Sequence, residues 1–219
     1  MTRDKAGIFI VDDHELVRRG LRQLINGTTD MQVSAEAASI AAALQHLATE
    51  HTPDVAIIDL SLPDGNGIEL IKRLHAKHPA MRLLVSSMHD EELYAERALL
   101  AGARGYINKQ ETAERVLDAL RAILQGRIYL NERMRTRLGG STDSEGPRDS
   151  TAPLEQLSDR ELEVYELIGR GHRTTEIAQY LHLSIKTIET YRAHIKRKLN
   201  LESSAALTCS AVRWTLEQA

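Results

Sequence analysis

The sequence contains a single cysteine, one tryptophan and one phenylalanine, and it has no long apolar run. The lone Cys209 excludes an intramolecular disulfide and a cysteine-rich zinc site. No apolar run approaches the ~18 residues that a membrane-spanning helix needs, and the start of the chain, MTRDKAGIFIVDD, lacks the apolar stretch of a signal peptide. These absences predict a cytoplasmic globular protein, and 219 residues suffice for two ordinary domains.

The net charge is only −3, but the charges are unevenly distributed. Residues 1–130 contain 15 Lys and Arg against 18 Asp and Glu. Residues 184–199, SIKTIETYRAHIKRKL, contain five basic residues against one acidic residue. An acidic first part and a basic stripe near the end indicate two separate tasks.

Short apolar runs alternate with longer segments of helical periodicity over the first 125 residues. The five runs are residues 8–11, 31–35, 55–59, 82–86 and 104–107. Strands that alternate with helices are typical of a parallel sheet covered on both faces. The run DVAIID is apolar without alternation, as expected for a strand buried on both sides. We therefore predict a doubly wound α/β domain.

Polar residues stand where these apolar runs end. Asp12 and Asp13 follow the first run and Asp59 ends the third, while Ser87 and Lys109 follow the fourth and fifth. The carboxyl ends of parallel strands meet at one edge of a sheet. Adjacent carboxylates repel one another unless a cation lies among them, and Mg²⁺ prefers oxygen ligands. The pattern predicts a magnesium site, with Asp59 as a possible nucleophile toward a phosphoryl group.

Each of these residues also has a purely structural interpretation. Asp12 with Glu15 fits a helix capping box, and Asp59 or Ser87 could cap the turn or helix that follows it. Lys109 could be a solvated loop lysine. What favours a functional site is that all of these residues are expected at the same edge of the predicted sheet.

The segments DDHELVRRGL, IIDLSLPDGNGIEL and GYINK resemble, in order and spacing, the receiver domain of two-component response regulators. The resemblance covers roughly residues 5–127 and implies a flavodoxin-like (CheY-like) sheet of five strands. It implies that Asp59 accepts a phosphoryl group. The implied Mg²⁺ ligands are Asp12, Asp13, Asp59 and the backbone carbonyl of Ser61. The implied site lysine, switch hydroxyl and switch aromatic are Lys109, Ser87 and Tyr106.

A polar segment separates this region from the rest of the chain. Residues 139–153, GGSTDSEGPRDSTAP, contain no Leu, Ile, Val or aromatic residue and cannot form a core. We predict a first domain over residues 1–127, a linker with a possible short helix over 128–153, and a second domain over 154–219.

Four helical patterns follow the linker, without any strand signal. The first begins at a capping box formed by Ser158 and Glu161, and the third begins at Ser184 after a tight turn. On the third pattern, an apolar stripe consists of Ile188, Tyr191, Ile195 and Leu199. The opposite face carries small and basic residues and suits the major groove of DNA, although most charged faces are merely solvated.

The segments LSDRELEVYELIGRG and SIKTIETYRAHIKRKL resemble the LuxR-type helix-turn-helix, so the two regions together resemble NarL/FixJ response regulators. This resemblance implies base contacts by Glu189, Thr190 and Ala193. The implied phosphate contacts are Lys186, Thr187, Arg192, Lys196 and Lys198. The implied partners are a sensor histidine kinase, double-stranded DNA and a second copy of the chain, with a helix from about Ser203 to Leu216 as the dimer contact.

Two other functions fit part of the pattern. A Mg²⁺-dependent phosphohydrolase could use Asp59 as its nucleophile, but no general acid or substrate cap is evident, and we expect no enzymatic activity beyond the protein's own phosphorylation and dephosphorylation. The second of these functions is that of a regulator that binds DNA whether or not it is phosphorylated. For a switched regulator, we expect phosphorylation to draw Ser87 and Tyr106 inward and to unmask the DNA-binding helix, with dimerisation as the rival switch.

Overall fold

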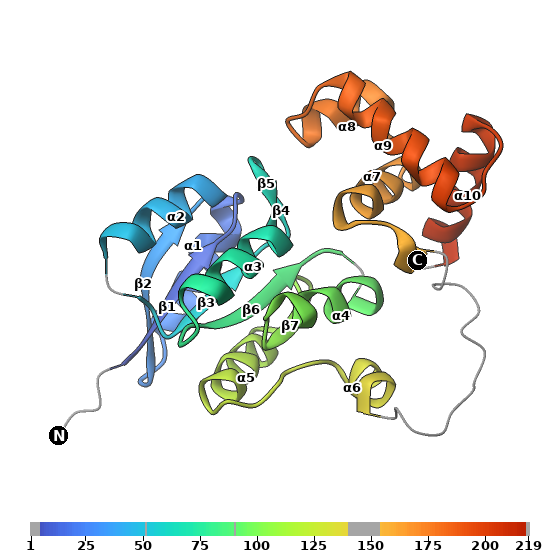
Figure 1. Cartoon of the computed structure of the whole chain (residues 1–219). Helices are drawn as coiled ribbons and strands as arrows, with labels where there is room; N and C mark the ends of the chain where they lie inside the picture. The colour runs from blue at the N-terminus through green and yellow to red at the C-terminus, as the bar shows by residue number, and fades with distance from the viewer. Residues whose placement is uncertain (1–4, 51, 90, 140–153, 218–219) are drawn as a thin grey trace. The chain divides into compact units, whose positions relative to one another are not determined.

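The computed structural model describes residues 5–50, 52–89, 91–139 and 154–217. The chain forms two compact units, residues 1–143 and 144–219, which Figure 1 colours from blue to yellow and from orange to red. The first part of the predicted linker forms helix α6 (Glu132–Gly139), and its remainder, residues 140–153, lies outside the described residues.

A parallel sheet of five strands is the centre of the first unit, with strand order β2-β1-β3-β6-β7. The strands are β1 (Ala6–Val11), β2 (Met31–Ala37), β3 (Val55–Ile58), β6 (Arg82–Ser87) and β7 (Gly105–Asn108). Each apolar run of the sequence forms one strand, so the predicted flavodoxin-like sheet is confirmed. The chain reverses its direction of winding between β1 and β3, where such sheets bind their ligands.

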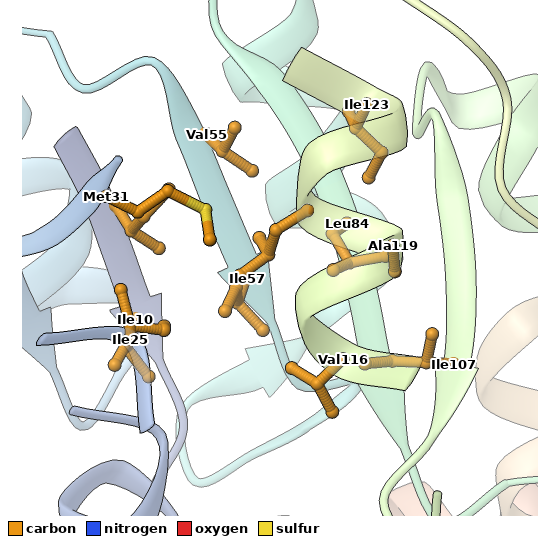
Figure 2. Close-up of a cluster of buried hydrophobic side chains, with 12 residues drawn as sticks. Ile10, Ile25, Met31, Val55, Ile57, Leu84, Ile107, Val116, Ala119 and Ile123 are labelled. Atoms are coloured by element: carbon orange, nitrogen blue, oxygen red, sulfur yellow. The ribbon is translucent and has the colours of Figure 1, made fainter. Parts of the chain in front are cut away.

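Helices cover both faces of this sheet (Figure 1). One face packs against α1 (Glu15–Asn26) and α5 (Ala113–Leu124), while α2 (Ile40–Thr49), α3 (Gly67–Lys77) and α4 (Glu91–Ala101) cover the other. In Figure 2, Val116 and Ala119 of α5 lie over Ile57 and Leu84 of the sheet, all of them buried. Alternate residues of a strand point to opposite faces of the sheet. Because helices cover both faces, every residue of β3 is buried.

A small antiparallel hairpin, β4 (Ser61–Leu62) with β5 (Gly65–Asn66), lies between β3 and α3 and was not predicted. Its position depends on Asp64, whose two carboxylate oxygens accept the backbone N–H groups of Ile40 and Ala41 at 2.7 Å. These N–H groups open α2 and have no partner within their own helix. Asp64 therefore connects the loop that follows β3 to the first turn of α2.

The second unit is all-helical, and its four predicted helices are confirmed as α7 (Asp159–Gly169), α8 (Thr174–Tyr180), α9 (Ile185–Lys198) and α10 (Ser204–Glu217). A short 3-10 turn, η1 (Leu154–Gln156), precedes them. The capping box at Ser158 and the cap at Ser184 both form. Ile188 and Ile195 of α9 are fully buried, as the apolar stripe predicts. Within the described residues, no helix has both the length and the apolar character needed to span a bilayer.

Candidate functional site

Three carboxylates meet at the carboxyl edge of the sheet. Strand register pairs Val11 with Ile58, so the residues that follow them, Asp12 and Asp59, leave the sheet at the same level. Both are only 2% exposed, whereas Asp13 is exposed. One ligand atom from each of these residues, together with one from His14, falls within a span of 4.8 Å. The structure therefore brings the predicted acidic residues together.

Lys109 bridges the two buried carboxylates. Its Nζ lies 2.7 Å from Asp12 Oδ2 and 2.7 Å from Asp59 Oδ2. The lysine is held just past β7 because its backbone N–H donates to the Ser87 carbonyl. Burial raises the pKa of Asp59, with Lys109 opposing the rise. Burial would lower the pKa of Lys109, but the charges and hydrogen bonds of Asp59 and Asp12 outweigh burial and raise it, so the ammonium stays charged.

Two further residues support the acidic cluster and were missed by the sequence analysis. His14 Nδ1 lies 2.6 Å from Asp13 Oδ1 and 3.3 Å from Asp12 Oδ1. Arg18 Nη1 donates to the Asp12 carbonyl at 2.7 Å. Both belong to the segment DDHELVRRGL, so proximity to the aspartates was the only signal that could have indicated them.

Gly67 begins α3 directly against the backbone of Asp59. A Cβ atom at this position would overlap the Asp59 carbonyl oxygen. Two contacts hold Gly67 close to Asp59: the Gly67 N–H donates to the Leu60 carbonyl at 2.8 Å, and the Asn66 side chain caps α3. The last glycine of LPDGNG is thus required for packing next to the acidic site.

A second group of contacts lies beside the acidic cluster and converges on His89. Ser61, which donates its backbone N–H to Asp59 Oδ1 at 3.3 Å, lies with its Oγ 2.8 Å from His89 Nε2. The His89 N–H donates to Ser87 Oγ at 3.2 Å, and the Tyr106 hydroxyl donates to the His89 carbonyl at 2.9 Å. His89 was not among the predicted residues. No local pattern singles it out other than its place two residues after Ser87.

The switch aromatic implied by the resemblance, Tyr106, lies inward in this structure and is 1% exposed. Its hydroxyl finds a partner in the His89 carbonyl, and a buried phenol needs such a partner. This hydrogen bond holds the ring in its inward position.

The second candidate surface is the polar face of α9. The exposed residues on this helix include Lys186, Glu189, Thr190 and Ala193, and the half-buried ones include Thr187, Arg192, Lys196 and Lys198. These are the eight residues predicted to contact DNA. All of them thus reach solvent on one helix, and the two fully buried positions, Ile188 and Ile195, anchor its other side.

Three of the eight residues also have partners within the second unit. Thr187 Oγ1 lies 2.8 Å from Ser184 Oγ, and Thr190 Oγ1 donates to the Lys186 carbonyl at 3.0 Å. Lys198 Nζ donates to Glu161 Oε2 at 2.6 Å. Lys198 therefore joins α9 to α7, a role that the charge pattern did not indicate.

Glu161 is the acceptor for several donors around the start of α7. Besides Lys198, it accepts the backbone N–H of Ser158 at 2.7 Å, and His194 Nδ1 lies 3.5 Å from its other oxygen. Burial alone would raise the pKa of Glu161, but the hydrogen bonds from Lys198 and Ser158 outweigh it and lower that pKa. Glu161 is therefore ionised at neutral pH.

The chain is similar to known proteins over both of its units. Residues 8–121 match the model of the response regulator receiver domain, and residues 155–211 match that of the bacterial regulatory proteins of the luxR family. The oxygen regulatory protein NreC of Staphylococcus epidermidis is 37% identical over 211 residues, which cover 94% of this chain and 96% of NreC. NreC of Staphylococcus carnosus is 36% identical over 210 residues, with the same shares of the two chains.

Solved structures of similar proteins match either part or nearly all of this chain. A LuxR-family two-component response regulator from Aurantimonas sp. is 36% identical, covers 63% of this chain and 97% of its own, and has a TM-score of 0.57. RcsB of Salmonella enterica, bound to the promoter rprA in the presence of the phosphomimetic BeF3-, is 27% identical and covers 95% of this chain and 99% of its own, with a TM-score of 0.66. The chain therefore belongs to the response regulators of the NarL/FixJ type, in which a receiver domain precedes a LuxR-type DNA-binding domain.

Proposed function

We propose that this response regulator is switched by phosphorylation of Asp59 and controls transcription by binding promoter DNA through α9. The observation that carries the first part is the bridge from Lys109 to the two buried carboxylates of Asp12 and Asp59. A buried ammonium beside a buried carboxylate provides fixed positive charge where a phosphoryl group would arrive. The family membership supplies the donor class, a sensor histidine kinase.

The donor set fits Mg²⁺. Asp12, Asp13 and Asp59 offer carboxylate oxygens within a small span, and the Ser61 carbonyl is the proposed fourth protein ligand. Lys109 pairs with Asp12 and Asp59 but not with Asp13, so the cluster accommodates further positive charge. When bound, Mg²⁺ would offset the negative charge of the carboxylates and of the phosphoryl oxygens.

Asp59, Lys109 and Ser87 have different roles in the proposed phosphoryl transfer. An Asp59 oxygen forms the new bond to phosphorus while the bond from phosphorus to the donor breaks, and the donor keeps the electron pair. Lys109 keeps its charge beside the transferred group. Ser87 Oγ accepts the N–H of His89, so its own hydrogen can be donated to a phosphoryl oxygen.

The DNA-binding part of the proposal is supported by the surface of α9 and by a relative. RcsB, which shares the architecture, was solved on a promoter. On α9, the exposed Glu189, Thr190 and Ala193 would face bases. The proposed phosphate contacts are Lys186, Thr187, Arg192, Lys196 and Lys198. A second copy of the chain would bind beside the first through α10. The protein would act in the cytoplasm, where its DNA lies.

Intact-mass measurement tests the phosphoacceptor. A small phosphodonor with Mg²⁺ should add one phosphoryl group to the wild type, and Asp59→Asn should abolish the addition. Asp13→Asn should slow labelling, with partial recovery at high Mg²⁺, because it removes one proposed ligand. Asp118→Asn, an exposed substitution on α5, is the matched control. Unchanged labelling of Asp59→Asn would refute the assignment, and rapid sustained turnover of a phosphate ester would indicate an enzyme instead.

A further inference from the structure

The tip of the hairpin formed by β4 and β5 is anchored to α2 by one side chain. Asp64 lies in the turn between the two short strands, and its carboxylate oxygens accept the N–H groups of Ile40 and Ala41, each at 2.7 Å. Hydrogen bonds from backbone N–H groups to an ionised carboxylate are stronger than those between neutral groups. The side chain of Asp64 therefore fixes the tip of the hairpin to the first turn of α2.

The start of α2 also has a cap of its own, which does not involve the hairpin. The Ser39 hydroxyl oxygen accepts the N–H of Ala42 at 3.2 Å. The first N–H groups of a helix have no partner within the helix, and one capping side chain usually satisfies only one of them. The contacts from Asp64 are thus additional to the ordinary cap of α2, and they serve the hairpin as well as the helix.

The base of the hairpin lies directly beside the acidic site. Ser61, the first residue of β4, donates its backbone N–H to Asp59 Oδ1 at 3.3 Å. In the hairpin, Ser61 pairs with Asn66, whose buried side chain accepts the N–H of Ile68 at 2.8 Å and caps α3. The Ser61 carbonyl is the proposed fourth protein ligand of Mg²⁺. The contacts that hold the hairpin therefore also hold this carbonyl.

The hairpin is too small to keep its position without such contacts. Strands β4 and β5 contain two residues each and form a two-stranded sheet of their own. An isolated two-stranded hairpin is at best marginally stable in water. Because a backbone carbonyl moves with its strand, any displacement of the hairpin would also displace the carbonyl of Ser61. The two hydrogen bonds of Asp64 supply the stabilisation that the short ladder lacks.

We infer that Asp64 is a positioning residue for the metal site: by anchoring the hairpin to α2, it holds the Ser61 carbonyl where that oxygen can bind Mg²⁺. This inference rests on the proposed function, in which three carboxylates and this carbonyl hold the ion. The carboxylate of Asp64 is bound to α2 and does not belong to the acidic cluster. Residues that orient a metal ligand change the affinity for the metal without binding it themselves.

Two other roles of Asp64 make different predictions. A carboxylate attracts cations through its charge alone, but salt screens this attraction between exposed charges that are more than ~10 Å apart at 0.1 M ionic strength. A residue that only capped α2 would affect the stability of that helix, as Ser39 does, and would leave Mg²⁺ binding unchanged. Positioning instead predicts a loss of Mg²⁺ affinity that depends on how many acceptor oxygens remain at position 64.

Isothermal titration calorimetry of the full-length protein measures the dissociation constant of Mg²⁺. We expect Asp64→Ala to raise this constant roughly three- to tenfold, less than the roughly 10–100-fold loss that follows removal of a direct partner of a metal ligand. Asp64→Asn keeps one acceptor oxygen and should give an intermediate constant. Ser39→Ala, which removes the other cap of α2, is the matched control and should bind Mg²⁺ as the wild type does.

Titrations at high salt distinguish positioning from charge. If Asp64 acts through the hairpin, the difference between wild type and Asp64→Ala should persist at high salt. An unchanged constant in Asp64→Ala, an equal loss in Ser39→Ala, or a difference that vanishes at high salt would overturn the inference. Asp64 is exposed, so both of its variants should fold. Absence of Mg²⁺ binding by the wild type would instead refute the metal site itself, so the two failures remain distinct.

Discussion

Lys198 Nζ lies 2.6 Å from Glu161 Oε2 and thereby ties the last turn of α9 to the first turn of α7. The Glu161 side chain is 5% exposed and the Lys198 side chain is 32% exposed, so the carboxylate is shielded from water and the lysine is only partly shielded. A lysine that is proposed to contact DNA phosphates thus also holds α9 in position. These two roles can be separated experimentally.

The stability of the DNA-binding domain should depend on this pair. We expect Lys198→Met to lower the midpoint of urea unfolding, because it leaves the buried Glu161 carboxylate without its cation. Trp214, the only tryptophan of the chain, lies on α10 near the Tyr165 ring, so its fluorescence reports this domain. Lys196→Met is the neighbouring control and should leave the midpoint nearly unchanged. Equal midpoints for wild type and Lys198→Met would show that the pair contributes nothing measurable.

The same pair should make the stability of this domain depend on pH. The pKa of Glu161 is lowered in the folded state, so its contribution is present above the usual glutamate value and is lost as pH falls through the folded pKa. We expect wild type to lose stability across this acidic range and Glu161→Gln to lose less. Urea midpoints from Trp214 fluorescence at several pH values measure the slope. A steeper acid slope in Glu161→Gln than in wild type would contradict the sign.

DNA binding should separate phosphate contacts from base contacts on α9. We expect Lys196→Ala to weaken binding to all sequences and to reduce the slope of log K against log salt by about 1. Glu189→Ala should instead change base preference at one position, worth ~1–3 kcal/mol. Fluorescence anisotropy over a salt series with several operators measures both, with Lys77→Ala on α3 as control. Equal losses for every sequence in both variants would show that α9 does not read bases.

The acidic site should be more dependent on Mg²⁺ when its lysine is removed. Lys109→Gln leaves two buried carboxylates without a cation, and breaking such a buried pair costs about 3–5 kcal/mol. We expect a lower melting temperature in Mg²⁺-free buffer and a larger rise on Mg²⁺ addition than in wild type, because ligand binding stabilises the folded state. Circular dichroism melts with and without Mg²⁺ measure both quantities. The exposed Lys77→Gln serves as control, and an identical Mg²⁺ response in all three proteins would argue against a metal at these carboxylates.

Two glycines of the receiver should respond in opposite directions to the same substitution. Gly67→Ala places a methyl group against the Asp59 carbonyl, so it should destabilise the domain and slow labelling of Asp59. Gly20→Ala meets nothing within 4 Å in the middle of α1 and should stabilise the helix by up to ~1 kcal/mol. Thermal melts and intact-mass labelling of the two variants provide the comparison. A neutral Gly67→Ala would mean that α3 shifts away from Asp59 without loss.

Much of the architecture follows from local patterns that are visible in the sequence. The apolar runs form the five strands, and the residues after them, Asp12, Asp59 and Lys109, converge because parallel strands end at one edge. The helices of the second unit begin at Ser158 and Ser184, whose hydroxyls cap their own helices. Such features depend on neighbours a few residues away, and periodicity and capping are local properties of the chain.

Other features depend on residues that are distant in sequence, and only the tertiary structure decided them. The contacts of Asp64 with α2, of Ser61 with His89 and of Glu161 with Lys198 join residues 23 to 37 positions apart. The inward position of Tyr106 likewise depends on a carbonyl 17 residues away. Each of these contacts satisfies a buried or partly buried polar group, and any of several side chains could serve as its partner. Which one does so is set by how the strands and helices pack, and no local pattern contains that information.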